Sequence, residues 1–199
     1  MKKIFVILVT VFILSACGST NVKRVESGSQ PDLSGYWNDI DVRKVCDALI
    51  NDCLSSPRVN QAIRASGSRI PMVIVGRFRN ASSEQIDTEI ISLRMENAIF
   101  NSGRLDFVSG GDTRDDIRQE RLDQQNWASE ETMAKLRRET GADYMMTGSV
   151  HTIVDREGNR TVRTYYVTAE LTNIETNERM WMSQNSDITK IVTRPANQL

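Results

Sequence analysis

The stretch DYMMTGSVHTIVDREGNRTVRTYYVTAELTN, residues 143–173, alternates apolar and polar side chains with a period of two. This period is typical of β-strands that bury one face. Alternate residues from Tyr165 to Leu171 share one side of the second half, and Gly158 marks a turn in the middle. We therefore predict a β-hairpin of two long antiparallel strands.

Further strands flank this hairpin along the chain. The turn NIETNE and the segment RMWMSQNS, residues 179–186, predict a third antiparallel strand. Upstream, PMVIVGRF at 71–78 is a short apolar run typical of a buried strand, and RLDFVSG at 104–110 predicts another. Between these two we expect a helix of about fourteen residues, capped by Asp87 and ended by Gly103.

Helical periodicity predicts three more helices. Residues 39–54 carry an apolar stripe, with Asp39 or Asp41 as cap, and Pro57 should stop that helix before a loop at 58–70. Residues 112–127 predict a helix with few apolar side chains, and residues 130–141 predict one more, with acids at its start and bases near its end.

The order of these elements predicts an α/β (α+β) domain. A helix between the two early strands implies a parallel crossover, and the meander implies antiparallel pairing. We expect a mixed sheet of about five strands with helices packed on it. The expected organisation is a signal peptide at 1–16, a flexible tether at 17–36, a globular domain at 37–190 and a tail at 191–199.

The N-terminal segment predicts export and lipidation. Lys2 and Lys3 precede an apolar run from Ile4 to Leu14, which is too short to span a membrane as a helix. The sequence Leu-Ser-Ala-Cys that ends at Cys17 resembles the bacterial lipobox, where the signal is cut before the cysteine and the thiol receives a lipid. We therefore predict an anchor at Cys17, stable once it carries two or more acyl chains. Gly18, rather than an aspartate, favours sorting to the outer membrane.

Charge and cysteine content exclude some partners. Cleavage after residue 16 would leave 183 residues with a formal charge of −3, which offers no electrostatic basis for binding nucleic acid. Cys46 and Cys53 lie seven residues apart in one predicted helix, farther than a disulfide can reach if the helix is intact. Either the helix ends early and the pair bridges, or both are buried thiols; we favour the second interpretation.

No catalytic constellation is visible, and we predict no enzyme, cofactor, metal or small-molecule substrate. His151 is the only histidine and fits an exposed strand position. Two-histidine zinc motifs, phosphate-binding glycine loops and the G-x-S-x-G elbow are absent from the sequence. Acid pairs such as Asp115–Asp116 lie in predicted first turns of helices, where acids are stabilising.

The segment RQERLDQQNWAS, residues 118–129, is a candidate contact surface. Arg118, Arg121 and Trp127 are residue types that are enriched at interface hot spots. The competing interpretation places Trp127 in a gap between helices and leaves both arginines solvated, and we favour it over the contact surface.

Several motifs together resemble one family. GYWNDIDVRKVCDALINDCLSSPRV, PMVIVGRFRNASSEQIDTEI, SGRLDFV, RDDIRQERLDQQNWAS, TGADYMMTGSV and LTNIETNERMW, in this order over about residues 35–190, are similar to the LpoB family of lipoprotein activators of penicillin-binding proteins. The resemblance implies a domain like the N-terminal domain of TolB, no enzymatic activity, and a place on the inner face of the outer membrane. It implies that a bifunctional peptidoglycan synthase, a class A penicillin-binding protein, is the partner. The tether here is shorter and poorer in proline than in well-known members.

Two other functions stay open from the sequence. One is a non-catalytic component of an envelope secretion or assembly complex, similar to the curli secretion lipoprotein. The other is an envelope hydrolase; if it used a Ser-His-Asp triad, that triad would have to include His151.

Overall fold

The computed structural model describes residue 26 and residues 32–125 and 141–195. Its first helix, α2 (Asp39–Ser55), follows the predicted stripe, which it buries from Val42 to Leu54. The predicted cap is wrong: Asn38 is the N-cap, because its side chain accepts from the N–H groups of Ile40 and Asp41. Asp41 completes a capping box by accepting from the Asn38 N–H.

The predicted loop after α2 is also wrong in part. Pro57 starts a second helix, α3 (Pro57–Ala65), because proline fits the first turn of a helix, where its missing N–H costs no hydrogen bond. Cys46 and Cys53 are both buried free thiols on α2, as we favoured. Burial raises the pKa of each thiol from its usual 9.0 to about 12.

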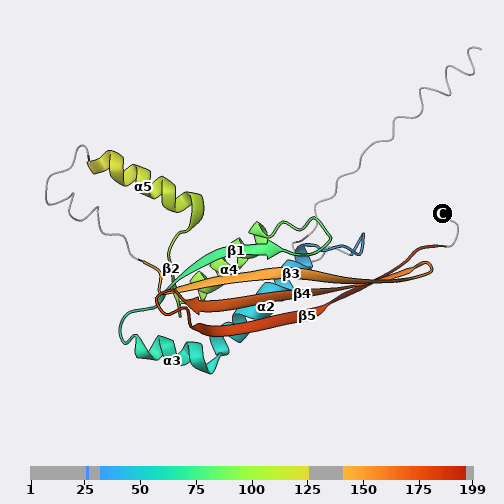
Figure 1. Ribbon diagram of the computed structural model, residues 1–199, viewed down its shortest axis with the longest axis horizontal. Helices are drawn as coiled ribbons and strands as arrows, with labels where there is room; N and C mark the ends of the chain where they lie inside the picture. The colour runs from blue at the N-terminus through green and yellow to red at the C-terminus, as the bar shows by residue number, and fades with distance from the viewer. Residues whose placement is uncertain (1–25, 27–31, 126–140, 196–199) are drawn as a thin grey trace, which may run out of the picture. The chain divides into compact units, whose positions relative to one another are not determined.

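Five strands form one mixed sheet in the order β2-β1-β3-β4-β5, which confirms the predicted fold class (Figure 1). β1 (Met72–Asn80) runs parallel to β2 (Asp106–Phe107) and to β3 (Tyr144–Glu157), and α4 (Glu89–Ser102) is the crossover between β1 and β2. Thr88 is the N-cap residue of α4, without a side-chain cap bond, whereas Asp87 accepts from the Glu89 N–H. Gly103 ends α4 in the left-handed conformation, as predicted.

The hairpin of β3 and β4 (Arg160–Asn173) is confirmed, and its strands reach the two-residue turn Gly158–Asn159. β5 (Arg179–Thr193) is longer than the predicted strand and takes in Ile191–Thr193, which the sequence assigned to the tail. A bulge in β5 explains why the sequence pattern did not predict the full length of this strand. Val167 pairs with Asn185 but Tyr165 pairs with Ile188, so β5 carries one extra residue and its inward phase changes.

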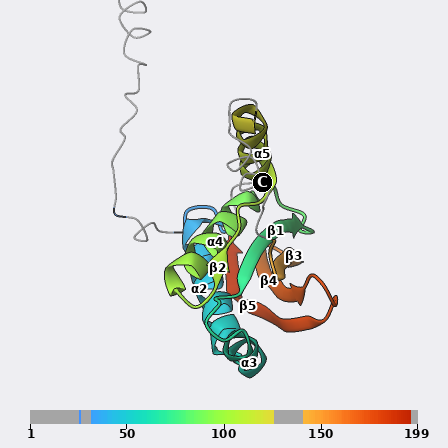
Figure 2. The same ribbon diagram turned by 90° about the vertical axis from the view of Figure 1, so that its left-hand side faces the viewer.

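One face of the sheet forms the core. Figure 2 shows α2 and α4 together on the same side of the strands. Inward side chains of β4 alternate from Tyr165 to Leu171 and are fully buried against these helices, while their neighbours on the other face are only half-buried. Gly148 of β3 has no room for a side chain, because a Cβ there would lie 2.2 Å from the ring of Phe78 and 2.3 Å from the Thr168 carbonyl oxygen.

A polar helix, α5 (Gly111–Gln125), follows β2 where the sequence predicts one. Its apolar side chains Ile117 and Leu122 are exposed. The helix predicted at residues 130–141 lies outside the described residues. Among the residues that are described, no helix is both long and apolar enough to cross a membrane.

Candidate functional site

The most highly charged part of the core lies at the edge of the sheet, where Arg163 of β4 and Lys190 of β5 pair directly in the strand register. Both side chains point to the helix-covered face, and the two residues are only 6% and 7% exposed. Two buried like charges side by side destabilise a sheet unless anions compensate them. Three acidic residues from other segments supply this compensation.

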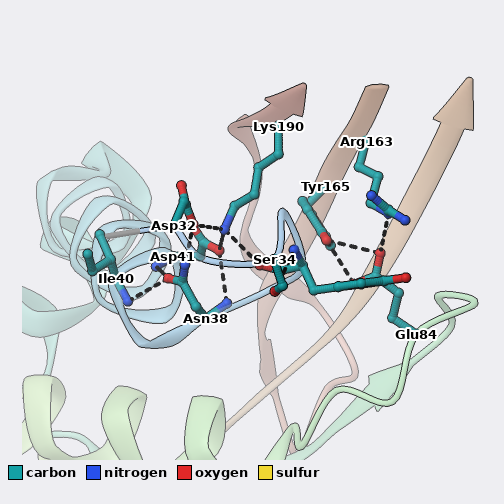
Figure 3. A network of polar contacts seen from close by, with 10 residues as sticks. Asp32, Ser34, Asn38, Ile40, Asp41, Glu84, Arg163, Tyr165 and Lys190 are labelled. Carbon is teal, nitrogen blue, oxygen red and sulfur yellow. Dashed lines mark hydrogen bonds and ion pairs between the residues drawn. The ribbon is translucent and has the colours of Figure 1, made fainter. Parts of the chain in front are cut away.

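Lys190 is held by the segment before α2, residues 32–38, which we name the strap. Its Nζ lies 2.5 Å from Asp41 Oδ2 and 2.6 Å from Asp32 Oδ1 (Figure 3). It also donates to the Tyr36 carbonyl oxygen at 2.8 Å. The hydrogen bond from Lys190 holds the pKa of Asp32 below its usual value. Lys190 thus ties both the strap and the first turn of α2 to β5.

Arg163 is held by the loop between β1 and α4. Its Nε lies 3.2 Å from Glu84 Oε1, and the Tyr165 hydroxyl donates to both Glu84 oxygens at 3.0 and 2.8 Å (Figure 3). Burial, followed by the contact with Glu84, raises the pKa of Tyr165, so its hydroxyl stays protonated as a donor. One buried carboxylate therefore fixes this loop to β4 through two side chains.

Aromatic contacts join the two ion clusters. The guanidinium of Arg163 lies 4.3 Å from the centre of the Tyr36 ring, and the ring of Trp37 lies 5.2 Å from that of Tyr165. Gly35 makes the turn that lets the strap approach: its φ is +68°, and a Cβ there would lie 2.1 Å from Val192 Cγ2. The strap is thus part of the folded domain, although the sequence assigned residues up to 36 to the tether.

A groove of about 530 Å³ opens between the strap, the first turn of α2 and the loop before α4. Its apolar walls are Tyr36, Trp37, Val42, Ile86 and Ile90. Its acidic residues are Asp39, Glu84 and Asp87, and among the described residues no lysine, arginine or histidine lines it. A second hollow of about 720 Å³ lies beyond the same loop, between α4, β1 and residues 107–113, and includes Leu93 and Glu96. Burial raises the pKa of Glu96.

None of the described residues that the sequence singled out as site residues lines this groove. Cys17 and Trp127 are outside the described residues. Arg118 is exposed on α5, where its Nη1 lies 3.5 Å from Asp115 Oδ1, and Arg121 of the same helix is half-buried. The contact surface predicted for these residues stays a prediction.

His151 is exposed on the outer face of β3, as the sequence indicates. Its Nε2 lies 3.1 Å from Ser149 Oγ, which in turn lies 2.9 Å from Thr168 Oγ1. Over the described part of the chain, no group of three histidine, cysteine or acidic residues could hold a metal ion.

Sequence reasoning missed the buried ion clusters, although one signal was present. Arg163 has the same phase on β4 as Tyr165, Val167 and Leu171, so the alternation of the strand puts its charge on the buried face. Lys190 gave no such signal, because the bulge in β5 shifts its phase.

The architecture defines a class: an α+β domain whose mixed five-stranded sheet is covered by helices on one face. Residues 41–186 match the family model described as peptidoglycan-synthase activator LpoB. The chain therefore belongs to the LpoB family, as its motifs indicate. No curated protein sequence matches this chain significantly.

Solved structures with a similar chain path include the LpoB C-terminal domain from Escherichia coli, with 14% identity and a TM-score of 0.45, covering 77% of this chain and 99% of that one. The LpoB C-terminal domain from Salmonella enterica has 18% identity and a TM-score of 0.37 over 69% and 94% of the two chains. The PelC dodecamer from Paraburkholderia phytofirmans has 16% identity and a TM-score of 0.35 over 62% and 73%.

Proposed function

We propose that this protein is an outer-membrane lipoprotein that binds a class A penicillin-binding protein in the periplasm and stimulates its synthesis of peptidoglycan. The observation that carries the proposal is the match to the peptidoglycan-synthase activator family over residues 41–186. The lipobox-like sequence ending at Cys17 supports the anchor. The protein acts by contact and performs no chemistry itself.

The mechanism is a shift between two states of the synthase. An activator raises activity only as far as it binds the active state more tightly than the inactive state. A tenfold difference between the two affinities corresponds to about 1.4 kcal/mol. A folded domain with fixed surface segments, such as the strap, is suited to making this distinction.

The direct test uses the full-length lipidated protein in detergent and a purified class A penicillin-binding protein from the same organism. We expect the protein to increase the rate of glycan polymerisation from lipid-linked precursor. An unchanged rate together with no detectable binding would contradict the proposal. Release of peptidoglycan fragments by the protein alone would favour the hydrolase instead.

The anchor is tested separately with Cys17→Ser. We expect the natural protein to incorporate labelled palmitate and to sediment with outer-membrane vesicles. The Cys17→Ser variant should lose both properties. Equal sedimentation of both proteins would mean that Cys17 is not the anchor.

A further inference from the structure

The groove beside the strap is built to keep its shape. One wall, the strap, is fixed to the sheet by Lys190, and the other, the loop before α4, is fixed through Glu84 to Arg163 and Tyr165. The side chains of Lys190, Arg163 and Glu84 are almost fully buried, so their contacts lose little strength to solvent screening, whereas Asp32, the carboxylate of the strap itself, is 56% exposed. The groove volume of about 530 Å³ falls in the usual range of binding sites, roughly 300–1,000 Å³.

The walls of the groove suit an apolar side chain. Val42 and Ile86 are buried at its base, whereas Ile90, on the first turn of α4, is 50% exposed. Within the described part of the chain, the buried indole N–H of Trp37 has no hydrogen-bond acceptor. Because this nitrogen is enclosed, an incoming ligand does not reach it directly, and what Trp37 offers the groove is the apolar part of its ring.

The charges of the groove suit a cation. Asp39 is neutralised by Arg43 at 2.8 Å, and Glu84 is occupied by Arg163 and Tyr165. Asp87 accepts the Glu89 N–H at 3.0 Å, and no basic side chain of the described residues forms an ion pair with it. Asp39 and Asp87 are both exposed in the groove, and of these two carboxylates only Asp87 has no basic partner among the described residues. An anion is disfavoured, although two helices start here, because their first turns already carry acids.

We propose that this groove is the docking surface for the synthase, and that it takes a segment of the synthase in which an apolar side chain lies next to a lysine or arginine. The inference rests on the proposed function and names its contact surface. Complementary charge sets the register of such a contact, while the apolar side chain supplies most of the affinity.

The test measures the affinity of the full-length lipidated protein in detergent for the purified class A penicillin-binding protein. Two variants change the groove: Asp87→Lys reverses its free charge, and Ile90→Ala removes an apolar wall. Two controls match them: Asp155→Lys makes the same change on the exposed end of β3, and Leu93→Ala removes a similarly exposed side chain of α4 that lines the second hollow.

We expect Asp87→Lys and Ile90→Ala each to weaken binding by about tenfold or more, and both controls to change it by less than about twofold. Raising the salt concentration should weaken binding of the natural protein more than that of Asp87→Asn, because that variant has no charge at this position. A photo-crosslinking residue at Gln85, which is exposed on the groove loop, should form a covalent adduct with the synthase.

The outcomes separate the two proposals. If the natural protein binds no class A penicillin-binding protein, the proposed function is wrong and this inference falls with it. If the natural protein binds and both groove variants bind as tightly as it does, the proposed function stands and only the assignment of the groove as docking surface is wrong. A loss of binding in Leu93→Ala but not in Ile90→Ala would place the contact in the second hollow. If Ile90→Ala instead lowers the mass of the protein particle and leaves synthase binding intact, the groove joins two copies of this chain. Contact in the second hollow and self-association through the groove would each contradict the proposed docking surface.

Discussion

The strap end of the sheet and helix α5 contain similar charged side chains but use them differently. At the strap end, Lys190 and Asp41 are each about 6% exposed and 2.5 Å apart, and the pair joins segments that are distant in sequence. On α5, Arg118 and Asp115 are 52% and 75% exposed and three residues apart. The first pair connects distant segments of the tertiary structure, whereas the second links neighbouring turns of one helix. Burial and sequence separation, rather than residue type, therefore decide what a charge contributes.

The largest effect should come from Lys190→Met, which leaves Asp41 buried with its carboxylate unpaired. Loss of one partner from a buried ion pair costs about 3–5 kcal/mol of unfolding free energy. Arg118→Met removes an exposed charge and should cost less than about 0.5 kcal/mol. Urea denaturation of both variants measures the difference. Equal midpoints would show that the buried pair contributes no more than the surface pair.

The buried thiols of α2 should make the stability of the domain sensitive to alkali. Burial raises the pKa of Cys46 and Cys53 from 9.0 to about 12, so above pH 9 the unfolded chain loses thiol protons before the folded one. Stability then falls as pH rises from 9 to 12, by about 1.4 kcal/mol per pH unit for each thiol. Denaturation of the natural protein and of Cys46→Ala at pH 8 to 11 isolates one thiol. If the unfolding free energies of the two proteins fall in parallel as the pH rises, Cys46 does not have the raised pKa that its burial implies.

A smaller effect is expected from Gly35→Ala, which should destabilise the strap by about 1–2 kcal/mol because alanine disfavours positive φ. The new Cβ would also displace Val192. Gly111→Ala is the matched change at the start of α5, where φ is +55° and nothing lies within 4 Å of the new Cβ. Limited proteolysis should cut near residue 35 faster in the first variant only. Equal rates would mean that the strap does not depend on this close approach.

The smallest effect concerns α5 itself. Leu122→Ala removes a side chain that is 56% exposed and should change the unfolding free energy by less than about 0.5 kcal/mol. If Leu122→Ala is instead as damaging as Lys190→Met, α5 packs against a surface in solution. The contrast between the two regions would then no longer hold.

Most of the fold was predictable because it follows local periodicity. The period of two in β3 and β4 and the apolar stripe of α2 each report a buried face directly. Helix α3 was missed because Pro57 ends one helix and starts the next, and proline suits both roles. The end of β5 was missed because the bulge shifts its alternation.

The candidate site was much less predictable. Asp32 and Tyr36 lie in a segment rich in glycine and serine, which is typical of a linker. What fixes this segment is Lys190, more than 150 residues later, and no local pattern encodes that contact. Arg163 could have been noticed from its phase, but its partner Glu84 lies in a loop without periodicity.

The strap has a consequence for reach. If Cys17 carries the anchor, the chain that separates membrane and domain is residues 17–31 at most, since Asp32 is already bonded to β5. Fifteen residues extend to roughly 50 Å at most. Any enzyme that this protein touches must then come within that span, plus the width of the domain, of the membrane that holds the anchor.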